Sequence, residues 1–197
     1  MVPPETIAER MLHLEPIAMR LEVKEGKNGC VLINDSYNSD LASLDIALDF
    51  MSRRSDDKGK KRTLILSDML ETGQSSKLLY RQVAELIHSR GVEKIIGVGE
   101  EIRTAAARFE IEKYFFRTTE ELLESDLLAG LRNEVILVKG SRAFHFDRIS
   151  DRLELKVHET ILEINLNALV DNLNYYRSKL KPETKMVCMV KASAYGA

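Results

Sequence analysis

The sequence predicts an α/β fold with a parallel sheet, and two observations lead to this prediction. Short apolar runs recur along the chain, and amphipathic helical patterns lie between them. The runs are mostly β-branched or aliphatic, which suits strands that are buried on both faces, as in parallel sheets. Strands that alternate with helices at this spacing predict βαβ units with right-handed crossovers.

The expected elements follow from these patterns in chain order. Strands are expected at the apolar runs Val31–Ile33, Leu64–Leu66, Ile95–Val98, Val135–Val138 and Met186–Val190, and at the alternating segment Ile161–Leu166. Apolar side chains at helical spacing predict helices over Leu41–Met51, Leu79–Ile87 (with Ser75 and Ser76 as caps), Ile102–Phe109 and Leu169–Leu180. A capping box at Thr118–Glu121 opens a further helix that Gly130 is expected to close, and the polar segment Ser52–Lys61 is expected to be a loop.

Composition excludes several classes of protein. The 197 residues carry 29 basic and 31 acidic side chains, so there is no basic footprint for nucleic acid and no polybasic membrane patch. The four histidines and two cysteines are too few and too scattered for a zinc module. With only Cys30 and Cys188, far apart in the sequence, a disulfide scaffold is not expected, and a reducing, cytoplasmic location is favoured. No apolar run reaches the length of a membrane span, and no signal peptide opens the chain.

The pattern changes toward the end of the chain. A boundary is expected near residues 153–158, because a strand, a helix and a second strand then follow with no further partners for the last strand. A single unit of this kind cannot bury both faces of its strand. The segment after the boundary is therefore interpreted as the truncated start of a second domain, and the polar opening of the chain as a start inside something longer.

Three polar segments follow expected strands: Asn34–Asn38, Leu66–Gly73 and Val138–Arg142. In an open α/β sheet, ligands bind outside the carboxyl ends of the strands, so these segments define a ligand-facing rim. Asp35 could accept hydrogen bonds from ribose hydroxyls, and Tyr37 could cover a base. An Asx-turn leading into the helix after Asp40 is an equally good interpretation of the first segment.

Two further glycine-containing segments differ in how strongly they indicate a ligand site. In the third segment a lysine, a small residue and an arginine with free backbone N–H groups suit an anionic oxygen. Gly97-Val98-Gly99 lies where a dinucleotide fingerprint would, but Ile102 replaces its third glycine, so a plain strand-to-helix turn is favoured. No GxxxxGK[ST] phosphate loop is present.

Four motifs together resemble the Mur ligases, in particular the type that adds D-Ala-D-Ala to UDP-N-acetylmuramoyl-tripeptide. They are Met19–Glu22, the DSYN of residues 35–38, the SDMLETG of residues 67–73 and the VKGSR of residues 138–142, and the resemblance covers residues 19–152. It implies a Rossmann-like, mostly parallel sheet with helices on both faces. This domain would close over ATP and Mg²⁺ held mainly by a central domain, of which residues 1–18 would be the end. The reaction proceeds through an acyl phosphate.

The resemblance also implies roles for residues. The ATP-binding residues would be Arg20, Asp35, Tyr37 and Asn38. The residues that face the dipeptide or the transferring phosphoryl group would be Asp68, Lys139, Ser141 and Arg142, and no metal ligand is expected in this chain. One departure is that Ser39-Asp40-Leu41 follows DSYN where the family often has Ala-Asn-Pro.

A second resemblance covers residues 158–197, after a linker at 153–157. Glu163–Leu169, Asn172-Leu173 and Val190–Gly196 are similar to the start of alanine racemases, which have a TIM-barrel fold. The resemblance implies that Lys191 forms the Schiff base with pyridoxal phosphate and that Tyr195 lies near the cofactor phosphate. Ser193 replaces a common aspartate.

The sequence is therefore interpreted as a piece of a fused ligase and racemase whose small-molecule substrates are UDP-N-acetylmuramoyl-tripeptide, D-Ala-D-Ala and alanine. Alone it is expected to catalyse neither reaction, because catalysis of this kind depends on positioning by several domains. The alternatives are another ligase of the superfamily, such as a folylpolyglutamate or cyanophycin synthetase, and a non-catalytic nucleotide-binding module. A phosphate loop in frame upstream of Met1 would support the ligase.

Overall fold

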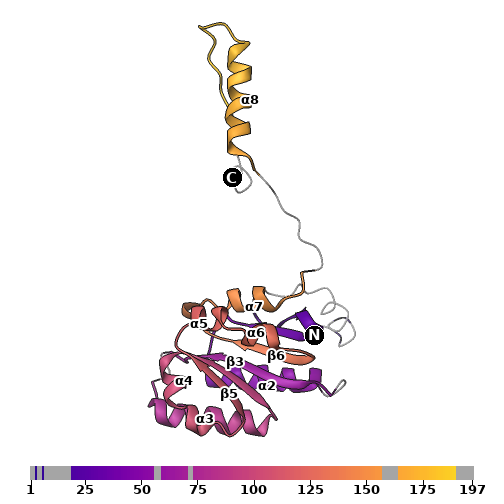
Figure 1. Ribbon diagram of the computed structural model, residues 1–197, viewed down its shortest axis with the longest axis vertical. Coiled ribbons are helices and arrows are strands. Elements are labelled where there is room, and N and C mark those ends of the chain that lie inside the picture. Colours follow the sequence, from indigo (N-terminus) through magenta and orange to yellow (C-terminus); the bar gives the residue numbers. More distant parts are fainter. Residues whose placement is uncertain are drawn as a thin grey trace. The chain divides into compact units, whose positions relative to one another are not determined.

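The structure is a computed structural model that describes residues 3, 6, 19–55, 59–70, 73–156 and 164–189. The chain divides into two compact units between Leu155 and Lys156. The first unit carries a sheet with helices on both sides, and the second carries one described helix (Figure 1). None of the described helices is long and apolar enough to cross a bilayer.

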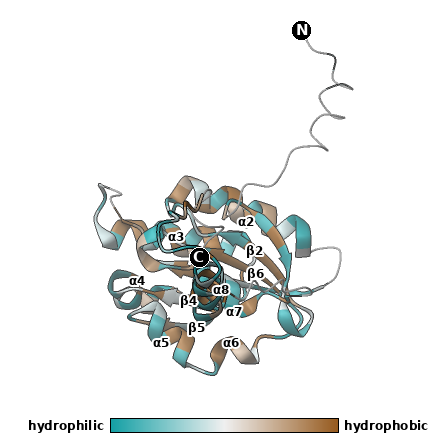
Figure 2. Cartoon of the chain, turned by 90° about the horizontal axis from the view of Figure 1, so that it is seen from above, coloured by the Kyte–Doolittle hydropathy of each residue, from teal (hydrophilic) through white to brown (hydrophobic). Residues whose placement is uncertain are grey.

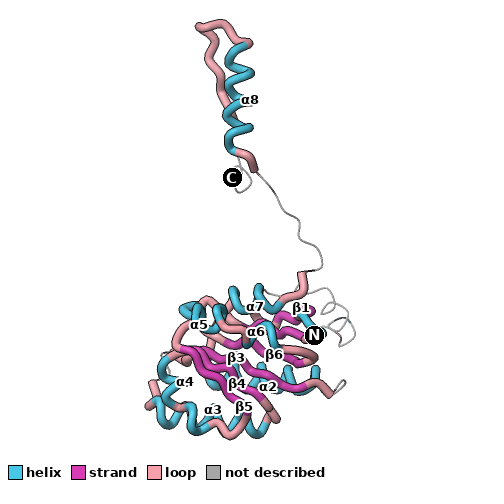
Figure 3. Tube along the Cα trace, viewed as in Figure 1, coloured by secondary structure: helices cyan, strands magenta, loops and turns pink. Residues whose placement is uncertain are grey.

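Six strands in the described part of the chain form one sheet in the order β1-β2-β6-β3-β4-β5 (Figure 3). β1 runs antiparallel to β2, and every other neighbouring pair is parallel, which confirms the mostly parallel sheet. The strands are β1 Glu22–Glu25, β2 Val31–Asp35, β3 Lys61–Ser67, β4 Lys94–Val98, β5 Glu112–Phe116 and β6 Glu134–Lys139.

The four central strands match the apolar runs of the sequence, whereas the edge strands β1 and β5 were not expected. β1 has the sequence EVKE and alternates between half-buried and exposed residues. β5 has the sequence EKYFF, and its first three residues are exposed. Because an edge strand has only one neighbour and little burial, its sequence lacks the continuous apolar run that marks a central strand.

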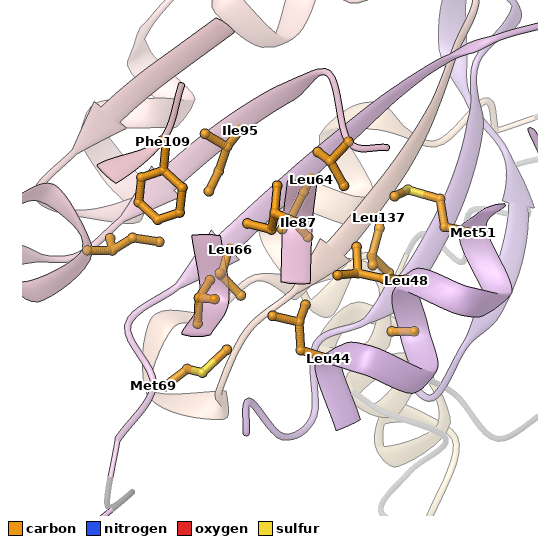
Figure 4. Packing of buried hydrophobic residues seen from close by; sticks show 14 of the residues in the cluster. Leu44, Leu48, Met51, Leu64, Leu66, Met69, Ile87, Ile95, Phe109 and Leu137 are labelled. Carbon is orange, nitrogen blue, oxygen red and sulfur yellow. The ribbon is translucent and has the colours of Figure 1, made fainter. Parts of the chain in front are cut away.

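The helices form a layer on each face of the sheet. α2 (Leu41–Ser55) and α3 (Ser76–Ser89) confirm the expected helices, and the shorter ones are α4 Glu100–Thr104, α5 Thr119–Glu124, α6 Leu127–Gly130 and α7 Asp147–Leu153. Leu44, Leu48 and Met51 of α2 pack with Ile87 of α3 on Leu64 and Leu66 of β3 (Figure 4). On the other face, α5, α6 and α7 pack on Ile65, Ile96 and Ile136, the strand residues of opposite pleat. Apolar strands such as β2 and β6 therefore lie between two helical layers (Figure 2).

Three expected boundaries were wrong. The helix expected over Ile102–Phe109 is broken at Ala105, between α4 and the 3₁₀ turn Ala106–Arg108. Thr118 caps α5 as expected, accepting from the Glu121 N–H at 3.2 Å. This helix ends at Glu124 and not at Gly130, because Ser125 is extended and donates to the carbonyl of Leu122 at 2.7 Å. The loop expected from Ser52 is shorter, since α2 continues through Ser55, and residues 56–58 lie outside the described part.

The first unit closes on itself beside β1. After α7, the Leu155 N–H donates to the carbonyl of Glu25 at 2.8 Å, and Gly26 bridges Glu154. The side chain of Lys24 forms an ion pair with Glu154 at 3.0 Å. Residues that lie 130 positions apart in the chain are therefore held side by side.

In the second unit, α8 (Leu166–Ser178) confirms the amphipathic helix before Pro182, with the Asn165 side chain accepting from the Ala168 N–H at 3.0 Å. The strand expected at Met186–Val190 is wrong for its described residues, which have no regular structure. Val187 and Met189 are 93% and 92% exposed, and no described strand pairs with them. The backbone hydrogen bonds that would stabilise a strand are therefore missing. For the strand expected at Ile161–Leu166, residues 161–163 lie outside the described part and Leu166 already belongs to α8.

Candidate functional site

The carboxyl ends of β2 and β6 lie side by side, with Asp35 and Lys139 as register partners. These are the last residues of their strands. Parallel pairing brings the polar segments that follow both strands to the same edge of the sheet. The first and third of the three polar segments predicted from the sequence therefore lie together at this edge.

Lys139 is almost completely buried, with a side chain that is 1% exposed. Its Nζ lies 2.9 Å from Oδ2 of Asp35 and also donates a hydrogen bond to the backbone carbonyl of Asn38. The ammonium group therefore faces Asp35 and the segment after β2. The nearby carboxylate and carbonyl hold this group inward, and the expected contact of Lys139 with a dipeptide or a phosphoryl group stays a prediction.

Asp35 and Tyr37 contact other residues that were expected to lie at the site. The Leu21 N–H donates to Oδ1 of Asp35 at 3.3 Å, which holds the Arg20-Leu21 segment against β2. The guanidinium carbons of Arg20 and Arg142 lie 4.3 Å and 4.0 Å from the centroid of the Tyr37 ring. Both distances are within the range of a cation–π contact. Arg142, expected on the substrate side, thus contacts Tyr37, the residue that was expected to lie against the base.

A cavity of about 200 Å³ lies between these residues and α2. The side chains around it include two carboxylates, two cations, an aromatic ring and an exposed isoleucine, from the set Arg20, Leu21, Asp35, Tyr37, Asn38, Asp40, Ser43, Ile46 and Lys139. A carboxylate can accept hydrogen bonds from sugar hydroxyls, and an aromatic ring beside it can stack on a flat base. Leu21, Asp40, Ser43 and Ile46 were not predicted as site residues, although an apolar residue on the solvent side of an amphipathic helix, as Ile46 is, is a usable signal.

The segment Asn34–Asn38 forms a local turn that leads into α2, and its role in ligand binding stays a prediction. Asn34 accepts a hydrogen bond from the Ser36 hydroxyl at 2.7 Å inside the protein, which fixes a local turn. Asp40 caps α2, since its Oδ1 accepts from the Ser43 N–H at 2.8 Å. This hydrogen bond from Ser43 holds the pKa of the Asp40 carboxyl below its ordinary value. The turn thereby leaves Asp35, Tyr37 and Asn38 free to line the cavity.

Asp68 is placed elsewhere and has a structural role. Its carboxylate accepts from the backbone N–H groups of Glu101 at 3.1 Å and Ile102 at 2.7 Å, and from the Tyr80 hydroxyl at 3.1 Å. Burial raises the pKa of Tyr80, with the charge of Asp68 as the second cause. Asp68 therefore caps α4 and does not line the cavity. Gly99 lies between β4 and α4 with a φ of +132°, so the expected strand-to-helix turn is confirmed.

The loop after β6 is tightly built. The Ser141 N–H donates to Oγ of Ser67 at 3.1 Å. A Cβ on Gly140 would lie 2.5 Å from the ring of Phe146, so only glycine fits there. Within the described residues, the buried hydroxyl of Ser141 has no hydrogen-bond partner, which is unusual for a buried polar atom and marks it as available to a ligand or water.

Other expected groups lie outside this site. Lys191 and Tyr195 are outside the described residues. Among the residues that the structure describes, no three histidine, cysteine, aspartate or glutamate side chains gather as metal ligands.

The fold and the site together define a class of protein. A mostly parallel sheet, covered on both faces and lined with polar side chains at the carboxyl ends of adjacent strands, is typical of open α/β domains that bind a ligand at that edge.

Residues 19–142 match the family described as "Mur ligase, glutamate ligase domain", and the chain belongs to this family. The UDP-N-acetylmuramoyl-tripeptide–D-alanyl-D-alanine ligase of Escherichia coli (strain K12) is 24% identical over 151 residues, which is 76% of this chain and 32% of that protein. The ligase of the same name from Rickettsia prowazekii is 32% identical over 122 residues, 61% of this chain and 26% of its own length. The chain thus spans about a third of these relatives or less.

Solved structures show the same fold. A crystal structure of MurF from Acinetobacter baumannii has a TM-score of 0.57 and 18% identity, covering 77% of this chain and 33% of that one. MurF ligase from Thermotoga maritima, solved in complex with ADP, has a TM-score of 0.53 and 20% identity, covering 74% of this chain and 35% of that one.

Proposed function

We propose that this chain is the C-terminal domain of an ATP-dependent ligase that adds D-Ala-D-Ala to UDP-N-acetylmuramoyl-tripeptide. The observation that carries the proposal is the cavity at the ends of β2 and β6, where Asp35, Tyr37 and Arg20 meet. The names of the relatives support the choice of substrates over the folylpolyglutamate and cyanophycin alternatives. A cytoplasmic location is part of the proposal, and the free thiols of Cys30 and Cys188 agree with a reducing compartment.

In this proposal the described residues bind and orient the reactants. Asp35 accepts from the ribose hydroxyls, Tyr37 and Asn38 lie against the base, and Arg20 neutralises phosphate charge. Ser141 and Arg142 face the amine-bearing dipeptide or the phosphoryl group. Mg²⁺ would neutralise phosphate charge, but the described residues contain no cluster of three or more candidate ligands, so no step here is assigned to the metal.

Nucleotide binding by this chain tests the proposal, and an NMR titration with ATP measures the affinity. Replacing Asp35 by asparagine should weaken binding about tenfold or more, because an ionic hydrogen bond to the ribose is lost while the shape is kept. Replacing Arg20 by alanine should weaken binding through the lost charge.

Replacing Asp151 by alanine is the control, because Asp151 is an exposed carboxylate on α7 and does not line the cavity. If both site variants keep the wild-type affinity, this edge of the sheet is not the nucleotide site. The non-catalytic module would pass the same binding test, and a GxxxxGK[ST] loop in frame upstream of Met1 distinguishes the ligase from it.

We further propose that residues 158–197 begin a pyridoxal-phosphate-dependent alanine racemase fused to the ligase. The Val190–Gly196 motif supports this proposal, together with the separate unit that follows Leu155. Lys191 would hold the cofactor, which supplies an electron sink for removing the α-proton of alanine. Because Lys191 and Tyr195 lie outside the described residues, no step is derived for them.

The test of the racemase uses protein that carries the whole barrel. Pyridoxal phosphate should give a visible absorbance band that Lys191→Ala abolishes, since the band requires a covalent link to that amine. Lys181→Ala, at an exposed lysine of the same unit, should leave the band unchanged. A band and racemase activity that persist in Lys191→Ala would contradict the proposal. The present chain should give only a weak, non-selective adduct.

A further inference from the structure

We propose that Lys139 is a positioning residue for the nucleotide cavity, which fixes the Asp35 carboxylate and the Asn38 carbonyl relative to each other and contacts no substrate itself. The proposal rests on the proposed function, since it concerns how the nucleotide-binding residues are held. In this proposal Lys139 does not contact the dipeptide or the phosphoryl group, which is the role that the sequence resemblance implied for it.

The contacts of Lys139 join two parts of the cavity wall. Its ammonium group pairs with Oδ2 of Asp35 and donates to the carbonyl of Asn38, three residues further along the chain. The second oxygen of Asp35 accepts from the Leu21 N–H. One buried cation therefore orients a carboxylate whose other oxygen holds the segment that carries Arg20.

Burial strengthens the ion pair at the centre of this arrangement. The side chain of Lys139 is 1% exposed and that of Asp35 is 13% exposed, so water does not screen the pair strongly. The same cation acts on the start of α2, where its charge is among the causes that lower the pKa of Asp40, after the hydrogen bond from Ser43. Lys139 therefore acts on three residues of the segment from Asp35 to Asp40.

The chain offers a matched control at the opposite edge of the sheet. Lys94 begins β4 and is also a buried lysine, paired with Glu134 at 2.8 Å. It lines no part of the nucleotide cavity. Lys94→Met and Lys139→Met remove the same buried charge, but only Lys139→Met should change the cavity.

The first measurement is amide hydrogen exchange of the chain without ligand. In Lys139→Met, the Leu21 amide should exchange about tenfold faster or more relative to the amides of β3, because Asp35 is no longer held. In Lys94→Met that ratio should stay at its wild-type value. Equal acceleration of Leu21 and β3 in Lys139→Met is the result of a merely structural role and would overturn the proposal.

The second measurement is titration of both variants with ATP, following the amides of Arg20, Tyr37 and Asn38. Lys139→Met should bind about tenfold more weakly or worse, and Lys94→Met should bind as the wild type does. Wild-type affinity in folded Lys139→Met would overturn the proposal. If the wild-type chain itself binds no ATP, the nucleotide site fails separately, and the exchange measurement alone decides the role of Lys139.

If Lys139→Met does not fold, the unsubstituted chain still provides a test. The side-chain ammonium resonance of Lys139 should be visible because of its burial, and Lys94→Met identifies the other buried lysine. Added ATP should shift the Lys139 signal and leave that of Lys94 in place. A Lys139 signal that stays fixed while the cavity amides shift would contradict the positioning role.

Discussion

Gly99→Ala should lower the free energy of unfolding by about 4 kcal/mol, combining backbone strain with the loss of buried hydrogen bonds. Gly99 has a φ of +132°, a region that is essentially restricted to glycine. A Cβ there would lie 2.2 to 2.5 Å from the carboxylate atoms of Asp68. The new methyl group must therefore displace the side chain that caps α4 and accepts from Tyr80.

Chemical denaturation of the chain measures this effect. Gly130→Ala is the control, since a Cβ at Gly130 would meet no atom within 4 Å. That change should alter the free energy of unfolding by less than about 1 kcal/mol. Equal stability of the two variants would show that Asp68 does not occupy the position described here.

Glu134→Leu should lower the free energy of unfolding by about 3 kcal/mol, because it leaves the buried ammonium of Lys94 without its nearest carboxylate. Lys94 and Glu134 are 9% and 8% exposed, and their charged atoms lie 2.8 Å apart. Glu134 also accepts a hydrogen bond from the Thr63 hydroxyl. Glu112, at 3.6 Å from Lys94, remains as a weaker partner. The expected loss of stability is therefore at the lower end of what breaking a buried ion pair costs.

The double variant Lys94→Met with Glu134→Leu provides the control. Because it removes both charges and refills the space with apolar atoms, it should recover most of the stability that Glu134→Leu loses. Thermal or denaturant unfolding of the single and double variants gives the coupling between the two sites. Additive losses would mean that the pair does not interact in the folded protein.

The central strands and the long helices could be predicted because each has a clear period. Leu44, Leu48 and Met51 recur at helical spacing and do form the inner side of α2. The ends of the shorter helices could not be predicted, because they depend on distant contacts. α4 begins where it does because Asp68, some 30 residues earlier, accepts from its first N–H groups.

The location of the candidate site could be predicted from the sequence, but the contacts between its side chains could not. Polar residues after parallel strands meet at one edge, so Asp35 and Lys139 had to be neighbours once β2 and β6 were paired. The inward direction of Lys139 depends on the carbonyl of Asn38, which the sequence cannot place. The contacts of Arg20 and Arg142 with the Tyr37 ring likewise join three separate segments of the chain.

The contact between β1 and the residues after α7 has an architectural consequence. The Leu155 N–H bonds to the Glu25 carbonyl, and Glu154 pairs with Lys24, so the last residues of the first unit are fastened to its first strand. The two ends of a domain are usually the first places to fray. Here neither end of the first unit can open without breaking its contacts with the other, so the edge strand β1 is held by both β2 and the residues after α7.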